Sequence, residues 1–131
     1  MQFTLMLSAA PHDPATRRAL GFAQALLAAG HHIARVFFYQ DAVQIASRLI
    51  VCPQDEQDMA AGWQALVREH RLDAVVCIAA ALRRGVLDAP EAARYGRDAD
   101  NLADGFVLSG LGQLHEALQG SDRLVHFKGD A

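Results

Sequence analysis

Short apolar runs recur along the chain and are separated by longer amphipathic or polar stretches. The runs lie at residues 3–7, 33–39, 73–77, 106–109 and 124–127. They are rich in valine, leucine, isoleucine and phenylalanine and are bounded by polar or turn residues. Brief unbroken apolar runs of this kind are typical of strands buried on both faces of a sheet. The pattern therefore predicts five strands.

The stretches between these runs carry apolar residues at helical spacing. Residues 15–27, 59–70 and 111–118 each place them three and four positions apart, which gives one apolar face to a helix. Asp13 followed by Pro14 predicts the start of the first helix, and Gly30 predicts its end.

Acidic residues indicate where the helix at 59–70 and two further helices begin. Asp41 is predicted to cap a short helix through residue 49, and Asp55 and Asp58 are predicted to form the acidic first turn of the next helix. Asp88 and Glu91 have the spacing of a capping box for a short helix ending near Tyr95.

Strands and helices alternate from one end of the chain to the other. This alternation predicts an α/β domain with three layers, in which a mostly parallel five-stranded sheet carries helices on both faces. A flavodoxin-like or Rossmann-like winding suits five strands of this length, and the order of the strands stays open. We expect one domain over residues 1–131, because nothing in the chain reads as a linker or a repeat.

Composition and charge narrow the class of function. The formal net charge is −3 and the bases are spread along the chain, so we expect no direct contact with nucleic acid. With no export signal and no run of ~20 apolar residues, we expect a cytoplasmic protein with reduced thiols and no membrane contact. The hydrophobic content of 52% is high and fits a surface partly covered by other subunits.

Cys77 is the candidate for chemistry, because it falls at the end of the third predicted strand. In open α/β sheets the carboxyl ends of the strands form the functional edge. Helix N-termini at that edge, and the nearby Arg83 and Arg84, would favour the thiolate, the nucleophilic form of cysteine. The alternative is an inert thiol packed in the core. Cys52 is 25 positions away, too far for a CxxC redox pair, and we interpret it as structural.

Two other patterns are weaker. Residues 109–114, Ser-Gly-Leu-Gly-Gln-Leu, place a GxG between a strand and a helix but lack the third glycine of a dinucleotide fingerprint. There are two other interpretations of this stretch. It forms a tight turn with close backbone packing, or it forms a helix N-terminus beside the thiol that can bind an anion. The six histidines show no metal-ligand spacing. We therefore expect neither a metal nor an organic cofactor.

Three blocks together carry a resemblance to a known family. They are Val-Phe-Phe-Tyr at 36–39, Val-Cys-Ile-Ala-Ala-Ala-Leu-Arg-Arg-Gly-Val at 76–86, and the stretch 109–114. In this order and spacing the chain resembles the TusD/DsrE sulfurtransferase family from residue 3 to residue 127. The resemblance implies that Cys77 is the active cysteine and that no cofactor is needed. The loop before Asp13, with Arg17 and Arg18 after it, departs from the family pattern, which bears on the choice of partner.

The resemblance also implies a role and partners. Members of this family accept sulfur as a cysteine persulfide from a small TusA-like donor and pass it to a small TusE/DsrC-like acceptor. They work with two smaller homologous TusB/TusC-like subunits in a heterohexamer with two copies of each. The TusD branch serves 2-thiolation of the wobble uridine of tRNA, which is the role we expect. The alternatives are a DsrE-type sulfur-oxidation relay, a non-catalytic assembly subunit, and a small-ligand binder that uses Gly110 and Gly112.

Overall fold

The computed structural model describes residues 1–129, apart from the side chain of Gln113, so the last two residues of the predicted domain lie outside it. The elements are β1 (Gln2–Leu7), α1 (Pro14–Ala28), β2 (His32–Phe38), the 3₁₀ helix η1 (Gln40–Ala46), α2 (Met59–His70), β3 (Ala74–Cys77), α3 (Ile78–Arg83), α4 (Ala89–Arg94), β4 (Phe106–Ser109), α5 (Gly112–Gln119) and β5 (Arg123–Phe127). The five strands predicted from the apolar runs are all confirmed.

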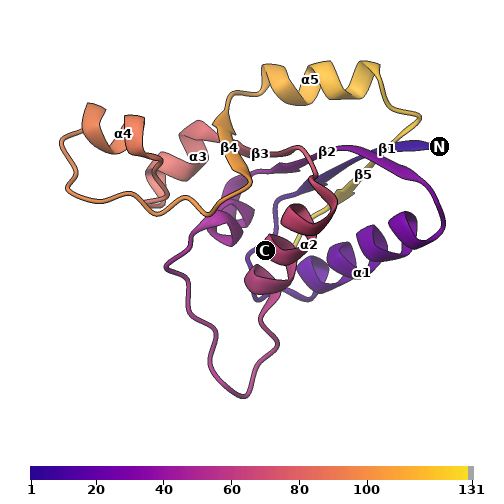
Figure 1. Cartoon of the computed structure of the whole chain (residues 1–131), viewed down its shortest axis with the longest axis horizontal. Helices are drawn as coiled ribbons and strands as arrows, with labels where there is room; N and C mark the ends of the chain where they lie inside the picture. The colour runs from indigo at the N-terminus through magenta and orange to yellow at the C-terminus, as the bar shows by residue number, and fades with distance from the viewer. Residues whose placement is uncertain (130–131) are drawn as a thin grey trace.

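All five strands are parallel and lie in the order β4-β3-β2-β1-β5. Helices α1 and α2 cover one face of the sheet and α5 covers the other (Figure 1). The prediction of a three-layer α/β domain is confirmed. The order shares the consecutive run 3-2-1 with the Rossmann winding, but here β4 continues that run and β5 returns to the far side of β1.

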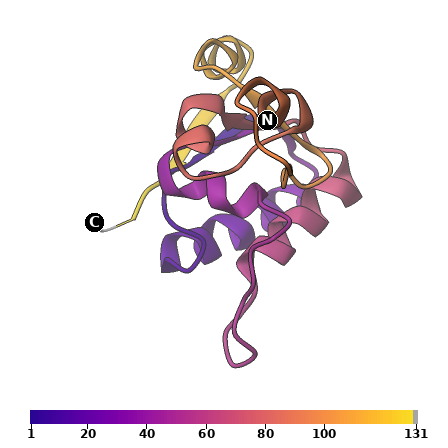
Figure 2. The ribbon, with the colours of Figure 1, turned by 90° about the vertical axis from the view of Figure 1, so that its left-hand side faces the viewer.

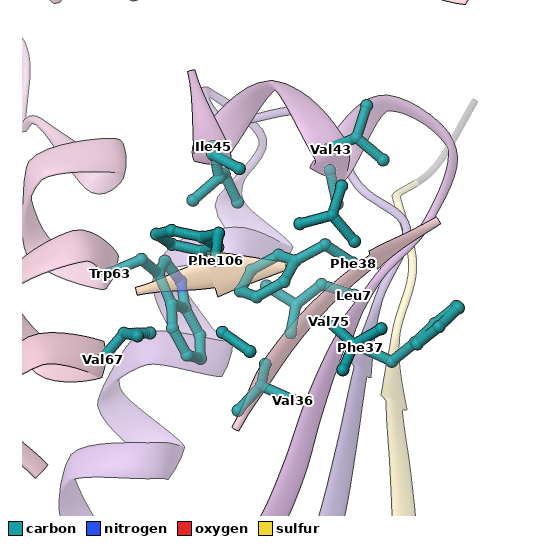
Figure 3. Close-up of a cluster of buried hydrophobic side chains, with 14 of the residues drawn as sticks. Leu7, Val36, Phe37, Phe38, Val43, Ile45, Trp63, Val67, Val75 and Phe106 are labelled. Atoms are coloured by element: carbon teal, nitrogen blue, oxygen red, sulfur yellow. The ribbon is translucent and has the colours of Figure 1, made fainter. Parts of the chain in front are cut away.

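Aromatic residues of the core pack between the sheet and α2. The ring of Phe38 lies 5.6 Å from that of Trp63 and 5.5 Å from that of Phe106, edge to face in both cases (Figure 3). The indole of Trp63 donates a hydrogen bond to the carbonyl of Thr16 at 3.4 Å, which links α2 to α1. This cluster holds β2, β4 and both helices together, and it positions the carboxyl ends of the central strands.

Three helices begin with an aspartate that accepts a backbone N–H. Asp13 caps α1 at 2.8 Å, Asp58 caps α2 at 2.9 Å and Asp88 caps α4 at 2.9 Å. The predicted starts at Asp13 and Asp88 are therefore confirmed. Asp55 was expected in the first turn of the helix that Asp58 begins, which is wrong, because α2 starts at Met59 and its first turn has no acidic residue.

The predicted cap at Asp41 is also wrong. The helix after β2 is a 3₁₀ helix that begins at Gln40, its N-cap is Tyr39, and no side chain caps it. The carboxylate of Asp41 instead accepts a bond from the Arg84 guanidinium at 2.8 Å. The helix ends at Ala46, short of residue 49, because Ser47 is extended and forms a bridge with Leu102.

One helix was absent from the prediction. Residues 78–83, for which the sequence indicated no element, form α3 directly after β3 with no loop between them. Alanine and leucine favour a helix once the chain has turned out of the sheet. Of the helices in the described residues, none is long and apolar enough to cross a membrane.

Candidate functional site

Cys77 occupies the last position of β3 and is also the N-cap residue of α3. Its side chain is buried, with 5% of the residue exposed. In the ladder between β3 and β4 its Cα pairs with that of Ser109, the last residue of β4. The structure therefore brings Cys77 and Ser109, which are 32 positions apart in the printed sequence, side by side at the carboxyl edge of the sheet.

The two residues lie where the chain leaves neighbouring strands in different directions. After β3 it enters α3, which packs on η1, and η1 packs on α2. After β4 it rises to α5 on the opposite face (Figure 1). In parallel sheets a crevice opens at the carboxyl ends of strands whose connections diverge in this way, and it is the usual place for a binding site. Cys77 thus lies at the switch point of this sheet.

The alternation of side chains places Cys77 on the face that α5 covers. Phe38 and Val76, which are paired in the ladder, face Trp63, so their neighbours Phe37 and Val75 point to the other face. Figure 3 shows Phe37 turned away from Trp63. Cys77 is two positions after Val75 and shares its face. The thiol is therefore on the side opposite to the aromatic core.

Ser109 shares this face with Cys77, because residues paired in a ladder point the same way. Adjacent strands are about 4.8 Å apart, so the hydroxyl and the thiol are neighbours. Ser109 is half-buried, and within the described residues its hydroxyl makes no hydrogen bond. A free hydroxyl beside a thiol can donate a hydrogen bond to the thiolate or to a sulfur bound to it.

The turn between Ser109 and α5 does not serve close packing. A Cβ atom added to Gly110 or Gly112 would meet no atom within 4 Å, so the interpretation as a tightly packed glycine turn is wrong. Helix α5 begins after Leu111 with no side-chain cap, and Leu111 is 54% exposed. The turn leaves the space next to Ser109 open.

The two arginines lie at the far end of α3 from the thiol. Arg84 is the C-cap residue of that helix, and its guanidinium binds Asp41 and the carbonyl of Ala80 at 2.8 and 3.1 Å. Arg83 is exposed in the last turn. The expected pairing of these charges with Cys77 is not seen, because the helix that the sequence analysis did not predict separates them by about 9 Å of rise.

Cys52 lies in a different place, in the loop between η1 and α2. That loop and the start of α1 line a hollow of about 510 Å³, and Cys77 is not among its lining residues. The Cys52 thiol donates to the carbonyls of Pro53 and Glu56 at 3.5 and 3.6 Å. Partial burial raises the pKa of this thiol, and the carboxylates of Asp58, Glu56 and Asp55 raise it further. Cys52 is therefore held in its protonated, weakly nucleophilic form.

Several histidines take part in local contacts. The terminal ammonium of Met1 donates a hydrogen bond to Nδ1 of His31 at 3.2 Å, and His126 bonds the hydroxyl of Ser8 at 2.8 Å. A search of the described residues finds no group of three or more histidine, cysteine or acidic side chains that could hold a metal ion.

Comparison with known proteins gives one family. The sequence model of the DsrE/DsrF-like family matches residues 1–127. The chain is 61% identical to a protein of Pseudomonas aeruginosa named "Sulfurtransferase TusD homolog", over 99% of each chain. It is 47% identical to the "Putative sulfurtransferase DsrE" of Allochromatium vinosum, over 97% of this chain and 98% of that one. The crystal structure of the YchN protein of E. coli, 19% identical, has the same fold, with a TM-score of 0.75 over 97% of this chain and 100% of that one.

The environment of Cys52 predicts a measurable pH dependence. In a Cys77→Ser variant, where Cys52 is the one remaining thiol, we expect iodoacetamide to react with a midpoint above that of an ordinary cysteine. The pKa is raised, so the reactive thiolate forms only at higher pH. Adding Glu56→Gln removes one negative charge and should lower the midpoint, whereas Asp98→Asn, which is not among the groups that raise this pKa, should leave it unchanged. A midpoint that does not fall with Glu56→Gln would contradict the assignment.

Proposed function

The chain belongs to the DsrE/DsrF-like family, and from that premise we propose that it is a sulfurtransferase whose Cys77 carries sulfur as a persulfide. The observation that carries the proposal is the place of Cys77 at the switch point of the sheet, beside an unpartnered hydroxyl. The relatives named sulfurtransferase cover nearly the whole chain, which supports the activity. Cys52 is unsuited to the role because its environment keeps it protonated.

The proposed reaction is a pair of thiol exchanges. The Cys77 thiolate attacks the terminal sulfur of a donor persulfide, a new S–S bond forms on Cys77, and the donor cysteine leaves as its thiolate. An acceptor thiolate then attacks the terminal sulfur on Cys77, and the Cys77 thiolate is released. One sulfur atom moves in each step with no net oxidation. Neither step needs a metal or an organic cofactor.

The proposed biological role is 2-thiolation of the wobble uridine of tRNA, as the name TusD of the P. aeruginosa relative suggests. The relative named DsrE, 47% identical over nearly the full length, supports sulfur-oxidation relay as a second candidate. A third candidate is a non-catalytic assembly subunit. The burial of Cys77 supports it, because a buried thiol is less accessible to a donor.

We also propose that the chain works in the cytoplasm with partner proteins. The proposed partners are two smaller homologous TusB/TusC-like subunits in a heterohexamer, a TusA-like donor and a TusE/DsrC-like acceptor. Exposed apolar residues support a covered surface. Val107 and Leu111, close to Ser109 in the chain, are 57% and 54% exposed, and Leu118 and Leu124 are also exposed. A subunit seated there would cover apolar surface and enclose the thiol.

Sulfur loading on Cys77 is expected to appear in the intact mass. After incubation with glutathione persulfide, the protein should gain the mass of one sulfur atom, and dithiothreitol should remove it. The gain should persist in Cys52→Ser and disappear in Cys77→Ser. Because Cys77 is only 5% exposed in the isolated chain, the measurement is repeated with the proposed partner subunits present. A gain that tracks Cys52, or none with all subunits present, would favour the assembly-subunit function.

Ser109 is expected to act as a positioning residue for the persulfide. Its hydroxyl, next to Cys77, can donate a hydrogen bond to the negatively charged terminal sulfur. Ser109→Ala should therefore shorten the lifetime of the loaded protein by about tenfold, the scale of one such bond, while Ser109→Thr retains most of it. The lifetime is followed by mass spectrometry in donor-free buffer. Equal lifetimes of the Ala and Thr variants would show that the hydroxyl has no such role.

The two relay functions differ in their effect on tRNA. In cells whose chromosomal copy carries Cys77→Ser, we expect 2-thiouridine derivatives to be lost from tRNA hydrolysates analysed by mass spectrometry. The same cells with Cys52→Ser should keep them, which controls for general loss of the protein. Normal 2-thiouridine in the Cys77→Ser cells would rule out tRNA thiolation through Cys77 and leave sulfur oxidation or the assembly-subunit function.

A further inference from the structure

We propose that the surface formed by Arg94, Tyr95 and Arg97, here called the α4 arginine surface, docks an acidic segment of the protein that exchanges sulfur with Cys77. The role of this contact in sulfur exchange rests on the proposed function of Cys77. The binding of an acidic segment to the surface does not depend on that function. Nothing in the reaction itself uses these three residues. They lie at the end of α4 and in the turn that follows it.

The two arginines are held against the tyrosine between them. The guanidinium of Arg94 lies over the Tyr95 ring at 5.9 Å from its centroid, and a guanidinium nitrogen of Arg97 donates to the Tyr95 carbonyl at 2.8 Å. Tyr95 is 49% exposed. Side chains that are already ordered lose less entropy on binding, and tyrosine and arginine dominate the energy of protein interfaces. The α4 arginine surface thus has the residue types and the ordered side chains that are typical of the centre of a protein interface.

The positive charge of this surface is compensated only in part, by the exposed carboxylate of Asp98, which directly follows Arg97. In the described part of the chain three ion pairs form, Arg35–Asp73, Arg48–Asp100 and Arg84–Asp41, and neither Arg94 nor Arg97 belongs to one. The two carboxylates of the α4 segment are occupied or turned inward. Asp88 caps the helix, and one oxygen of Glu91 is buried without a hydrogen bond. The first exposed carboxylate after Arg97 is Asp98.

The charge pattern favours a protein segment over a nucleic acid. Residues 83–98 carry four arginines and three acids, whereas the whole chain has a net charge of −3. A long polyanion such as RNA would lie across the acidic remainder of the surface and be repelled by it. A short acidic peptide bound to Arg94 and Arg97 would meet one acidic neighbour, Asp98, and avoid the rest of the acidic surface. The matching occupant is therefore an acidic stretch of a protein partner.

The α4 arginine surface lies at the same end of the molecule as the thiol. Helices α3 and α4 both lie beyond the carboxyl ends of the strands, the end that Figure 2 faces. Helix α3 starts at Cys77 and rises about 9 Å over its six residues. An extended arm gains about 3.3 Å per residue, so an arm of several residues leads from the docked segment to the sulfur. Such an arm suits a thiol that is 5% exposed, because a narrow chain end reaches it more easily than a folded surface does.

The experiment compares two synthetic acceptor peptides. Each peptide consists of five identical residues, a Gly-Gly spacer and a terminal cysteine. The five identical residues are glutamates in one peptide and glutamines in the other. Protein loaded with glutathione persulfide is freed of donor, and transfer of the sulfur from Cys77 to the peptide thiol is followed by mass at low salt. We expect the glutamate peptide to react about tenfold faster at equal low concentration. The advantage should shrink at 0.5 M salt, where charges are screened.

Matched variants assign the effect to the surface. Arg94→Gln with Arg97→Gln should abolish the advantage of the glutamate peptide, while Arg68→Gln with Arg71→Gln, which removes two exposed arginines at the end of α2, should preserve it. Equal rates for the two peptides would overturn the proposal. So would an advantage that survives Arg94→Gln with Arg97→Gln, or stronger competition by single-stranded RNA than by polyglutamate.

Binding without transfer separates this proposal from the function of Cys77. Fluorescence anisotropy with fluorescein-labelled peptides that end in serine measures docking on the unloaded protein. If Cys77 never loads but the glutamate peptide binds and the Arg94→Gln, Arg97→Gln variant does not bind it, the surface is supported and the carrier role fails. If Cys77 loads and the glutamate peptide binds no better than the glutamine peptide, the carrier role stands and the docking surface fails.

Discussion

The right-handedness of parallel crossovers determines where the thiol of this protein lies. From β1 to β4 the strands are added in one direction, so their connections must lie on one face, and the return from β4 to β5 must cross on the other. The chain therefore leaves β3 and β4 toward opposite faces, so the switch point of the sheet lies between these two strands. Cys77 and Ser109 are placed there by the ladder. The site is a product of topology, and the aromatic core around Trp63 holds it in position.

The local elements could be read from the sequence because their causes are local. Apolar runs give the strands, and Asp13 and Asp88 cap helices within three residues of themselves. One prediction failed because the deciding partner is distant. Asp41 looks like a helix cap until Arg84, 43 residues later, takes its carboxylate. The pairing of Cys77 with Ser109 depends on the strand order, which no local pattern carries.

The two cysteines show how environment separates identical side chains. Cys52 lies near the carboxylates of Asp55, Glu56 and Asp58, which together with partial burial raise its pKa. Its S–H group donates hydrogen bonds to backbone carbonyls. Cys77 is buried where β3 meets α3, and Ser109 is its neighbour across the ladder. In the sequence the thiols differ mainly in the acids near Cys52. The hydroxyl near Cys77 becomes visible only in the folded chain.

The absence of any loop between β3 and α3 has a consequence for how this region tolerates change. A single residue ends the strand and starts the helix, so no slack exists to absorb an insertion or a deletion there. Side chains of a strand alternate between faces with a period of two, and a shift of one position would turn the sulfur toward Trp63 and bury it in the aromatic core. Lengthening of the chain is more easily accommodated in the loop between η1 and α2, which lies outside the sheet.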